Sequence, residues 1–278
     1  METMTVKEMR LGEFEKLARL VYEQSGIKLE IHKRDLLQAR LRKRLKALGL
    51  EGFKDYLRFV EEDASGEEIV RMMDCVTTNK TEFFREERHF EHLAAQALPA
   101  LLQRPDRREE PLRLWSAACS TGEEVYGLAM TALERVGGTR TVKVLGTDLS
   151  TQVLTKALEG RYDADKTRAV PESWRAKYFI QEEFEGRLVD RAGHLLKQVT
   201  RFSRMNLNGG DYSFRSQFDV IFCRNVMIYF DTAIQQKLVE RLTACLKKGG
   251  YLYTGHSESL LRVKHELVNV GPSIYLKP

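Results

Sequence analysis

Residues 112–278 alternate between short β-rich runs and helical runs, and this alternation constrains the fold more than any other feature of the sequence. The strand-like runs are 112–117, 142–148, 200–207, 218–225 and 249–256, and two more close the chain at 265–270 and 273–278. The helix-like runs between them are 123–136, 150–160 and 232–250. Strands separated by helices are typical of a mostly parallel sheet covered by helices, so we expect an α/β fold.

Two further regions depart from this alternation. The first 78 residues contain only helical patterns, with Gly26 and Gly49 as stop signals, and predict a small all-helical domain. Residues 175–199 alternate weakly and are longer than an ordinary loop, which indicates a small antiparallel β subdomain inserted near 176–202. We therefore predict a helical domain over 1–78 and an α/β domain over 79–278.

Composition excludes several classes of protein. The chain is 42% hydrophobic and 31% charged, has no apolar run of membrane-spanning length, and begins with acids where a signal peptide needs an apolar core. Its four cysteines are far apart and form no C-x-x-C pair, as expected of free thiols in a reducing cytoplasm. We predict a cytoplasmic protein with no membrane insertion, no structural zinc and no other metal site.

Polar residues follow the strand-like runs at the points where a parallel sheet binds ligands. Gly122 and Glu123 come after the first strand, Asp148 after the second, and Asn206 and Asn225 after the next two. Each residue alone is common as a helix cap or a turn residue, but their joint placement indicates one crevice.

The turn after the first strand lacks G-x-G-x-x-G, and no G-x-x-x-x-G-K-[ST] occurs in the chain, which disfavours a nucleotide phosphate. Acids at that turn would repel a phosphate. They suit a cofactor with positive charge and ribose hydroxyls, as in S-adenosylmethionine.

A basic amphipathic helix is predicted within residues 32–50. Leucines at 37, 41, 45 and 48 fall on one side, whereas Arg40, Arg42, Lys43 and Lys46 fall on the other. Lys/Arg-rich faces of surface helices are commonly only solvated. The alternative is a docking surface for an acidic partner, either nucleic acid or an acidic protein helix.

Several long motifs resemble those of the chemotaxis receptor glutamate O-methyltransferases, the CheR family. They are "TTNKTEFFREERHF", "WSAACSTGEEVY", "GTDLS", "FDVIFCRNVMIYFD" and "GGYLYTGHSESL", and the likeness extends into "SGIKLEIHKRDLLQARLRKRLKALGL". The resemblance implies a Rossmann-like methyltransferase domain. It also implies transfer of a methyl group from S-adenosylmethionine to glutamates on the cytoplasmic helices of chemoreceptors, with S-adenosylhomocysteine as the product.

The resemblance also implies roles for individual residues. Arg85 and Tyr229 would be catalytic, Glu123 would meet the methionine ammonium, and Asp148 would meet the ribose hydroxyls. The remaining cofactor contacts would be Asn79, Thr81, Ala117, Asn206, Leu207, Asn225 and Val226, with Arg85 shared. The ordinary structural alternatives are that Arg85 pairs with Glu86 or Glu82 and that Tyr229 belongs to the core.

The chemistry agrees with these residues, because a glutamate is already ionised at neutral pH and needs no general base. The enzyme must supply alignment, exclusion of water and a counter-charge for the acceptor. Some family members grip a receptor C-terminal peptide with a Gly-x-Gly-Tyr loop in the β subdomain, and this chain has no such loop, so we expect no such tether. We expect a monomer that docks through Arg40, Lys43 and Lys46.

Two other functions remain open from the sequence alone. The basic helix would suit a nucleic-acid methyltransferase, but the Asn/Asp-Pro-Pro-aromatic motif of base-methylating enzymes is absent, and "RNVMIYFD" stands in its place. A cofactor-binding regulator without transfer activity is the second alternative.

Overall fold

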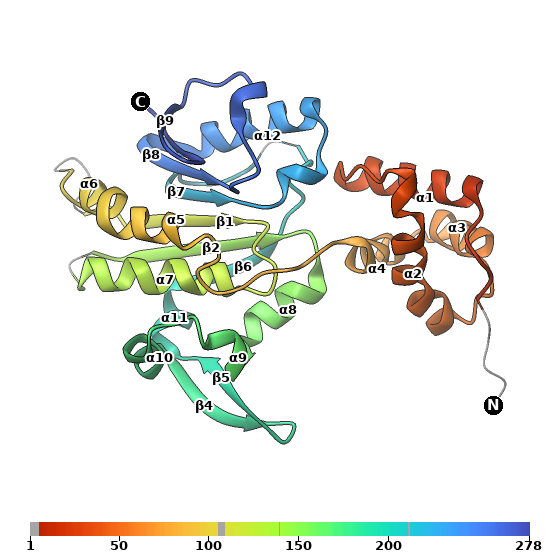
Figure 1. Ribbon diagram of the computed structural model, residues 1–278, viewed down its shortest axis with the longest axis horizontal. Helices are drawn as coiled ribbons and strands as arrows, with labels where there is room; N and C mark the ends of the chain where they lie inside the picture. The colour runs from red at the N-terminus through yellow and green to blue at the C-terminus, as the bar shows by residue number, and fades with distance from the viewer. Residues whose placement is uncertain (1–5, 105–108, 139, 211) are drawn as a thin grey trace.

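The computed structural model describes residues 6–104, 109–138, 140–210 and 212–278. Figure 1 shows an α/β domain and a helical domain set beside it, joined by the segment between α4 and α5. None of the helices in the described ranges combines the length and apolar character that a membrane span requires.

Within residues 6–78, the helical domain contains four helices and one 3-10 turn. They are α1 (Leu11–Ser25), η1 (Ile31–Lys33), α2 (Arg34–Leu48), α3 (Phe53–Glu62) and α4 (Glu67–Val76). In α2 the spacing predicted from the sequence is confirmed, because Leu37, Leu41 and Leu45 are buried in the domain core. The helix ends at Gly49, whose φ of +70° is a left-handed conformation that glycine adopts without strain.

The α/β domain is organised around a seven-stranded sheet in the order β6-β2-β1-β7-β8-β10-β9. Its strands are β1 (Leu112–Ala117), β2 (Val142–Asp148), β6 (Thr200–Arg204), β7 (Phe218–Cys223), β8 (Leu246–Thr254), β9 (Val268–Gly271) and β10 (Ile274–Leu276). The first five pair in parallel, whereas β10 is antiparallel to both β8 and β9. The predicted α/β class with a mostly parallel sheet is confirmed.

Helices cover both faces of this sheet. They are α5 (Glu87–His92), the π-helical turn η2 (Leu93–Ala97), α6 (Leu98–Leu102), α7 (Glu123–Val136), α8 (Thr151–Glu159) and α12 (Thr232–Cys245). Alternate residues of β1 supply the two cores, because side chains alternate across a strand. Leu114 packs with α7 on one face, and Trp115 packs with α12 on the other.

The predicted helix over 232–250 is wrong at its end, since α12 stops at Cys245 and the chain enters β8 at Leu246. Buried Lys247 explains the difference, because its ammonium bonds Asp219 at 3.3 Å and Glu110 at 2.7 Å. These partners are distant in sequence, so local helix propensity does not decide the boundary.

A second, three-stranded antiparallel sheet forms the small β subdomain, with the order β3-β5-β4. It contains β3 (Arg161–Asp163), β4 (Phe179–Phe184) and β5 (Arg187–Ala192), with α9 (Ala164–Thr167), α10 (Glu172–Tyr178) and α11 (His194–Val199) beside it. Two of its strands lie within residues 176–202, and β3 joins them from directly after α8. The last two short elements are η4 (Met227–Tyr229) and η5 (Leu260–Arg262).

Candidate active site

A pocket lies where the carboxyl ends of β1, β2, β6 and β7 face the helical domain. It encloses about 1120 Å³, part of it open to solvent. Sequence-predicted residues that line it are Arg40, Asn79, Thr81, Arg85, Asp148, Asn206, Leu207, Asn225, Val226 and Tyr229. Residues far apart in the chain therefore meet at the edge of the sheet where the sequence predicted a crevice.

The segment 77–86, which we call the strap, passes along this pocket between the two domains. The Arg40 guanidinium donates to the Val76 carbonyl and to Thr78 Oγ1, and Ser120 Oγ donates to the Asn79 carbonyl at 2.9 Å. Phe83 is buried against the β subdomain, with its ring centroid 5.0 Å from that of Tyr162. The strap is thus held at several points, and it carries Asn79, Thr81 and Arg85 into the pocket wall.

The turn after β1 has an unusual backbone. Ala118, Ser120 and Gly122 all have positive φ, and a Cβ on Gly122 would lie 2.9 Å from the Cβ of Ala157. The N–H of Ser120 points to Asp148 and donates to its Oδ2 at 2.8 Å. A carboxylate from the neighbouring strand therefore takes the N–H that a phosphate would use in a nucleotide site.

Asp148 lies at the end of β2 and is 8% exposed. Its Oδ1 also accepts from the N–H of Ser150 at 3.0 Å. Burial raises the pKa of Asp148, although the backbone N–H groups of Ser150 and Ser120 act to lower it. A carboxylate has more acceptor positions than these backbone groups use, so Asp148 can also accept from ligand hydroxyls in the pocket.

The two consecutive acids of α7 differ in their surroundings. Glu123 is fully buried and is not among the pocket-lining residues; its carboxylate pairs with Lys166 Nζ at 2.6 Å. Glu124 lines the pocket and accepts from Ser116 Oγ at 2.7 Å and from Arg224 Nε at 2.8 Å. Successive residues of a helix lie about 100° apart, so only one of the two acids faces the pocket.

The helical domain completes the pocket with Ser25, Ile27, Leu29, Lys33, Leu36 and Arg40. The Lys33 ammonium lies 5.9 Å from the centre of the Tyr229 ring, and the N–H of Lys28 donates to the Tyr229 carbonyl at 2.9 Å. Asn206 Nδ2 donates to the Gln24 carbonyl at 2.6 Å, which ties the end of β6 to α1. The sequence did not predict three pocket residues, Lys33, Glu124 and Arg224. The only signal for Glu124 was its position next to Glu123, and the only signal for Arg224 was its position next to Asn225.

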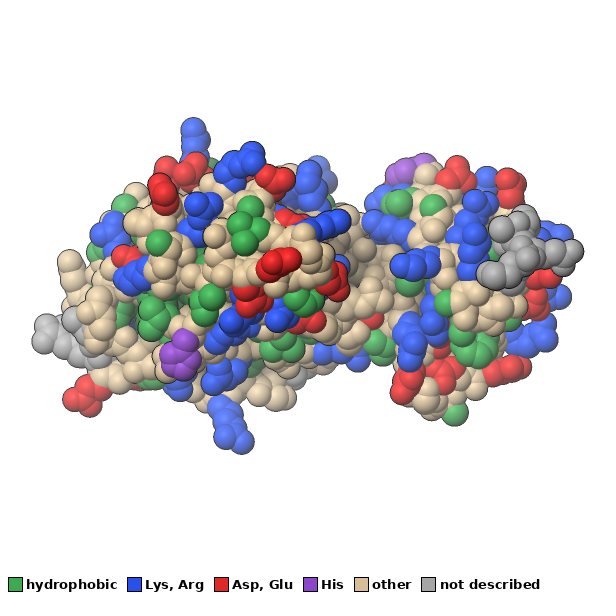
Figure 2. Space-filling view, turned by 90° about the horizontal axis from the view of Figure 1, so that it is seen from below, with side chains coloured by type: hydrophobic (Ala, Val, Ile, Leu, Met, Phe, Trp, Pro, Cys, Tyr) green, Lys and Arg blue, Asp and Glu red, His purple; other side chains and the backbone are tan. Residues whose placement is uncertain are grey.

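Three other sequence-predicted residues do not line the pocket. Ala117 is fully buried within β1, and Lys43 and Lys46 are exposed on α2. Arg40 is partly buried, and its guanidinium bonds Val76 and Thr78 at the start of the strap. Figure 2 shows Lys and Arg side chains gathered on the helical domain.

Comparisons with known proteins agree with this architecture. Residues 79–275 match the family described as CheR methyltransferase, SAM binding domain, and residues 12–77 match the CheR methyltransferase, all-alpha domain. The chain belongs to the CheR methyltransferases. The resemblance noted in the sequence motifs is thereby confirmed.

Relatives of this CheR chain are similar over nearly their whole length. A probable chemotaxis protein methyltransferase of Rhizobium etli is 38% identical over 92% of this chain and 96% of its own. The chemotaxis protein methyltransferase of Borreliella burgdorferi is 37% identical over 95% and 94%, and that of Escherichia coli is 36% identical over 94% and 89%. The comparisons favour methylation in chemotaxis over a nucleic-acid methyltransferase or an inactive regulator.

The CheR pocket fits S-adenosylmethionine, the cofactor of the family. Two buried acids, Asp148 and Glu124, face a ligand that carries positive charge, and the side chains of Leu207 and Val226 offer an apolar wall to a purine. The turn N–H of Ser120 is already bonded by Asp148 rather than open to a phosphate. This donor set agrees with a cationic, phosphate-free nucleoside.

Proposed function

We propose that the chain transfers a methyl group from S-adenosylmethionine to glutamate carboxylates on the cytoplasmic helices of chemoreceptors, forming methyl esters. The observation that carries the proposal is the charge layout of the pocket. Buried acids line its sheet side, and Lys33, Arg40 and Arg85 line it from the helical domain and the strap. A cationic cofactor and an anionic acceptor then each meet opposite charge.

Asp148 would hold the ribose hydroxyls, and Glu124 would meet the methionine ammonium in place of buried Glu123. Leu207 and Val226 would pack on the adenine, while Asn206 would contact its edge. The other residues that we propose for the cofactor are Asn79, Thr81, Arg85, Ala117 and Asn225. When bound, S-adenosylmethionine supplies an electrophilic methyl group whose bond to sulfur breaks with both electrons left on the sulfur.

The protein's own part in the reaction is alignment rather than proton transfer. An ionised glutamate already carries the lone pair that attacks, so the chain needs no base. Arg85 and Tyr229 would orient the acceptor carboxylate, and Arg85 Nη1 is held near the pocket by the Lys80 carbonyl at 3.1 Å. The strap excludes water from one side.

Docking of the receptor is proposed for the basic face of α2, through Arg40, Lys43 and Lys46. Arg40 also bonds Val76 and Thr78 at the start of the strap, so it would connect receptor docking to the position of the strap along the pocket. We further propose that residues 1–78 and 79–278 are separate domains of a cytoplasmic monomer, with receptor docking on the first and no receptor-peptide tether on the second.

The test is incubation of the protein with methyl-labelled S-adenosylmethionine and receptor-enriched membranes, followed by release of base-labile methyl esters as methanol. Arg85→Ala should lower the turnover number by roughly tenfold to 150-fold, since a charge-assisted contact to the acceptor is lost. Calorimetry should show a much smaller loss of affinity for S-adenosylhomocysteine. No methanol release by the wild type on any receptor preparation would refute the proposed acceptor.

A further inference from the structure

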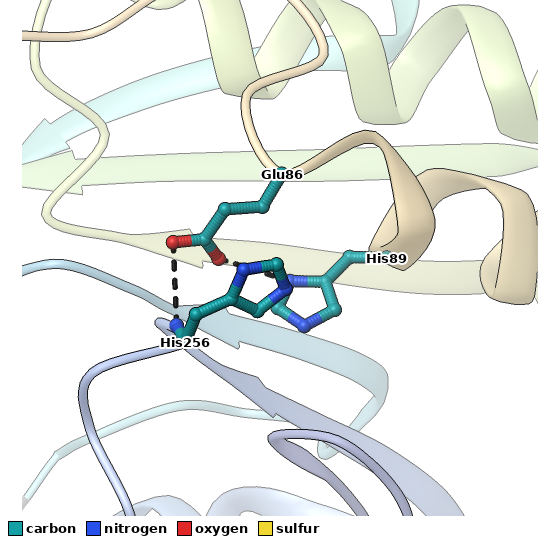
Figure 3. Close-up of side chains that lie close together, drawn as sticks. All are labelled: Glu86, His89 and His256. Atoms are coloured by element: carbon teal, nitrogen blue, oxygen red, sulfur yellow. Dashed lines mark hydrogen bonds and ion pairs between the residues drawn. The ribbon is translucent and has the colours of Figure 1, made fainter.

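A second set of polar side chains lies beneath the strap, behind the cofactor pocket. In the described ranges, Glu86, His89 and His256 are the His, Cys, Asp and Glu side chains that lie near enough to share a metal ion. Figure 3 shows Glu86 reaching from the strap to the backbone N–H of His256 and to the ring of His89. Arg224 Nη1 lies 3.3 Å from Glu86 Oε2, and this fixed cation favours a hydrogen-bond network over a metal site.

The ring of His89 is buried among polar partners. The side chain is 1% exposed, and its Nε2 lies 3.3 Å from the carbonyl oxygen of Pro272. Its Nδ1 lies 3.1 Å from Arg224 Nη1 and 3.2 Å from Glu86 Oε2. The ring therefore contacts both members of the Arg224–Glu86 ion pair.

Arg224 connects His89 to both halves of the active site. Its side chain is 2% exposed and lies over the rings of Phe90 and Phe222. Its Nε donates to Glu124 Oε2 at 2.8 Å, and its Nη1 donates to the Arg85 carbonyl at 2.7 Å. One guanidinium therefore holds the pocket acid and the backbone of the strap.

We propose that His89 is a positioning residue for methyl transfer, whose ring orients Arg224 so that Arg224 fixes the Glu124 carboxylate and the Arg85 backbone together. The proposal rests on the proposed function of Arg85 and Glu124. His89 is not one of the pocket-lining residues, and it acts on them through its contacts with Arg224 and Glu86.

Glu86, the second contact of the His89 ring, also reaches the pocket residue Asn225, whose Nδ2 donates to Glu86 Oε1 at 3.1 Å. Burial acts to raise the pKa of Glu86, but its bonds to His89 and Asn225 and the charge of Arg224 lower that pKa to about 2, so it stays ionised.

The other titratable rings around His89 are those of His256, with centroids 4.8 Å apart, and Tyr253, at 5.6 Å. His92 lies one turn further along, and its Nδ1 is 2.8 Å from Tyr253 Oη. Burial lowers the pKa of His92, and the nearby His89 adds to this effect. His92 bonds neither Arg224 nor Glu86 in the described structure, which makes it the matched control.

The experiment compares kcat and KM of the full chain and its variants. His89→Leu removes the polar contacts of the ring, so it should lower kcat by about tenfold to a hundredfold, with a smaller change in KM. His89→Asn keeps a polar side chain near the Nδ1 position and should retain most of the rate. His92→Asn should match the wild type in both constants.

A His89→Leu kcat equal to that of the wild type, or a His89→Asn kcat as low as that of His89→Leu, would overturn the proposal. Thermal melting reports whether each variant folds. If His89→Leu does not fold, His89→Asn is compared with His92→Asn, and a change in KM without a change in kcat would equally refute a role in positioning. If the wild type methylates no receptor, the proposed function fails, whereas affinity of the His89 variants for S-adenosylhomocysteine still tests the link to Glu124.

Discussion

Replacing Glu124 by Gln tests which of the two acids of α7 serves the cofactor. The substitution keeps the shape of the side chain and its contact with Ser116, but it removes the negative charge that faces the pocket. Arg224 keeps Glu86 as an ionic partner at 3.3 Å, so the guanidinium is not left unpaired. We expect the fold to survive and affinity for the cofactor to fall.

The size of the effect follows from the contact that is lost. A hydrogen bond to a charged group contributes about 1.5 to 3 kcal/mol, so affinity for S-adenosylmethionine should weaken by roughly tenfold to 150-fold. Glu123→Gln is the matched control, because it breaks the pair with Lys166 outside the pocket. Lys166 is 47% exposed and can rehydrate, so we expect a loss of about 1 to 2 kcal/mol in stability and an unchanged affinity.

Calorimetric titration with S-adenosylhomocysteine measures the affinities, and thermal melting reports stability. The control should melt roughly 2 to 8 °C below the wild type, given the usual entropy of unfolding for domains of this size. If Glu123→Gln binds weakly and Glu124→Gln binds as the wild type does, then Glu123 holds the methionine ammonium, as the family resemblance implied.

Three further predictions concern the ribose acid, the basic helix and the strap. Asp148→Asn should weaken binding of S-adenosylhomocysteine by about tenfold to a thousandfold in calorimetry, because the charge-assisted bonds to the ribose become neutral ones and the amide NH2 must face the N–H of Ser120 or of Ser150; wild-type affinity would contradict the role. Reversing Lys43 and Lys46 to Glu should abolish receptor methylation without changing cofactor affinity, and added salt should have the same effect on the wild type, since exposed pairs are screened over about 8 to 10 Å. A gel shift with RNA or DNA in parallel tests the nucleic-acid alternative. The pKa of Glu86 is lowered from 4.5 to about 2 in the folded protein. Ionised Glu86 therefore stabilises the fold above pH 4.5, and this stabilisation is lost as the pH falls toward 2. The melting temperature of Glu86→Gln should therefore lie below that of the wild type near neutral pH and approach it at low pH, and a difference independent of pH would refute the assignment.

The sequence by itself determined the class of fold and the place of the pocket. Alternating apolar residues, as in Leu112–Ala117, predict strands because hydrophobic burial and backbone pairing act within a few residues. Turn and cap residues such as Gly122 and Asp148 then mark the strand ends, and parallel strands bring those ends to one edge. The long motifs also identified the family.

Only the tertiary structure decided which side chains complete the pocket. The rotation of α7 on the sheet directs Glu124 into the pocket and Glu123 toward Lys166. The sequence does not show which of two adjacent acids faces the pocket. Docking of the helical domain brings Lys33 and Arg40 to the same pocket, and packing of α5 beside the end of β7 brings His89 to Arg224, 135 residues away in the chain. These contacts depend on packing between distant segments, and such packing leaves no local pattern in the sequence.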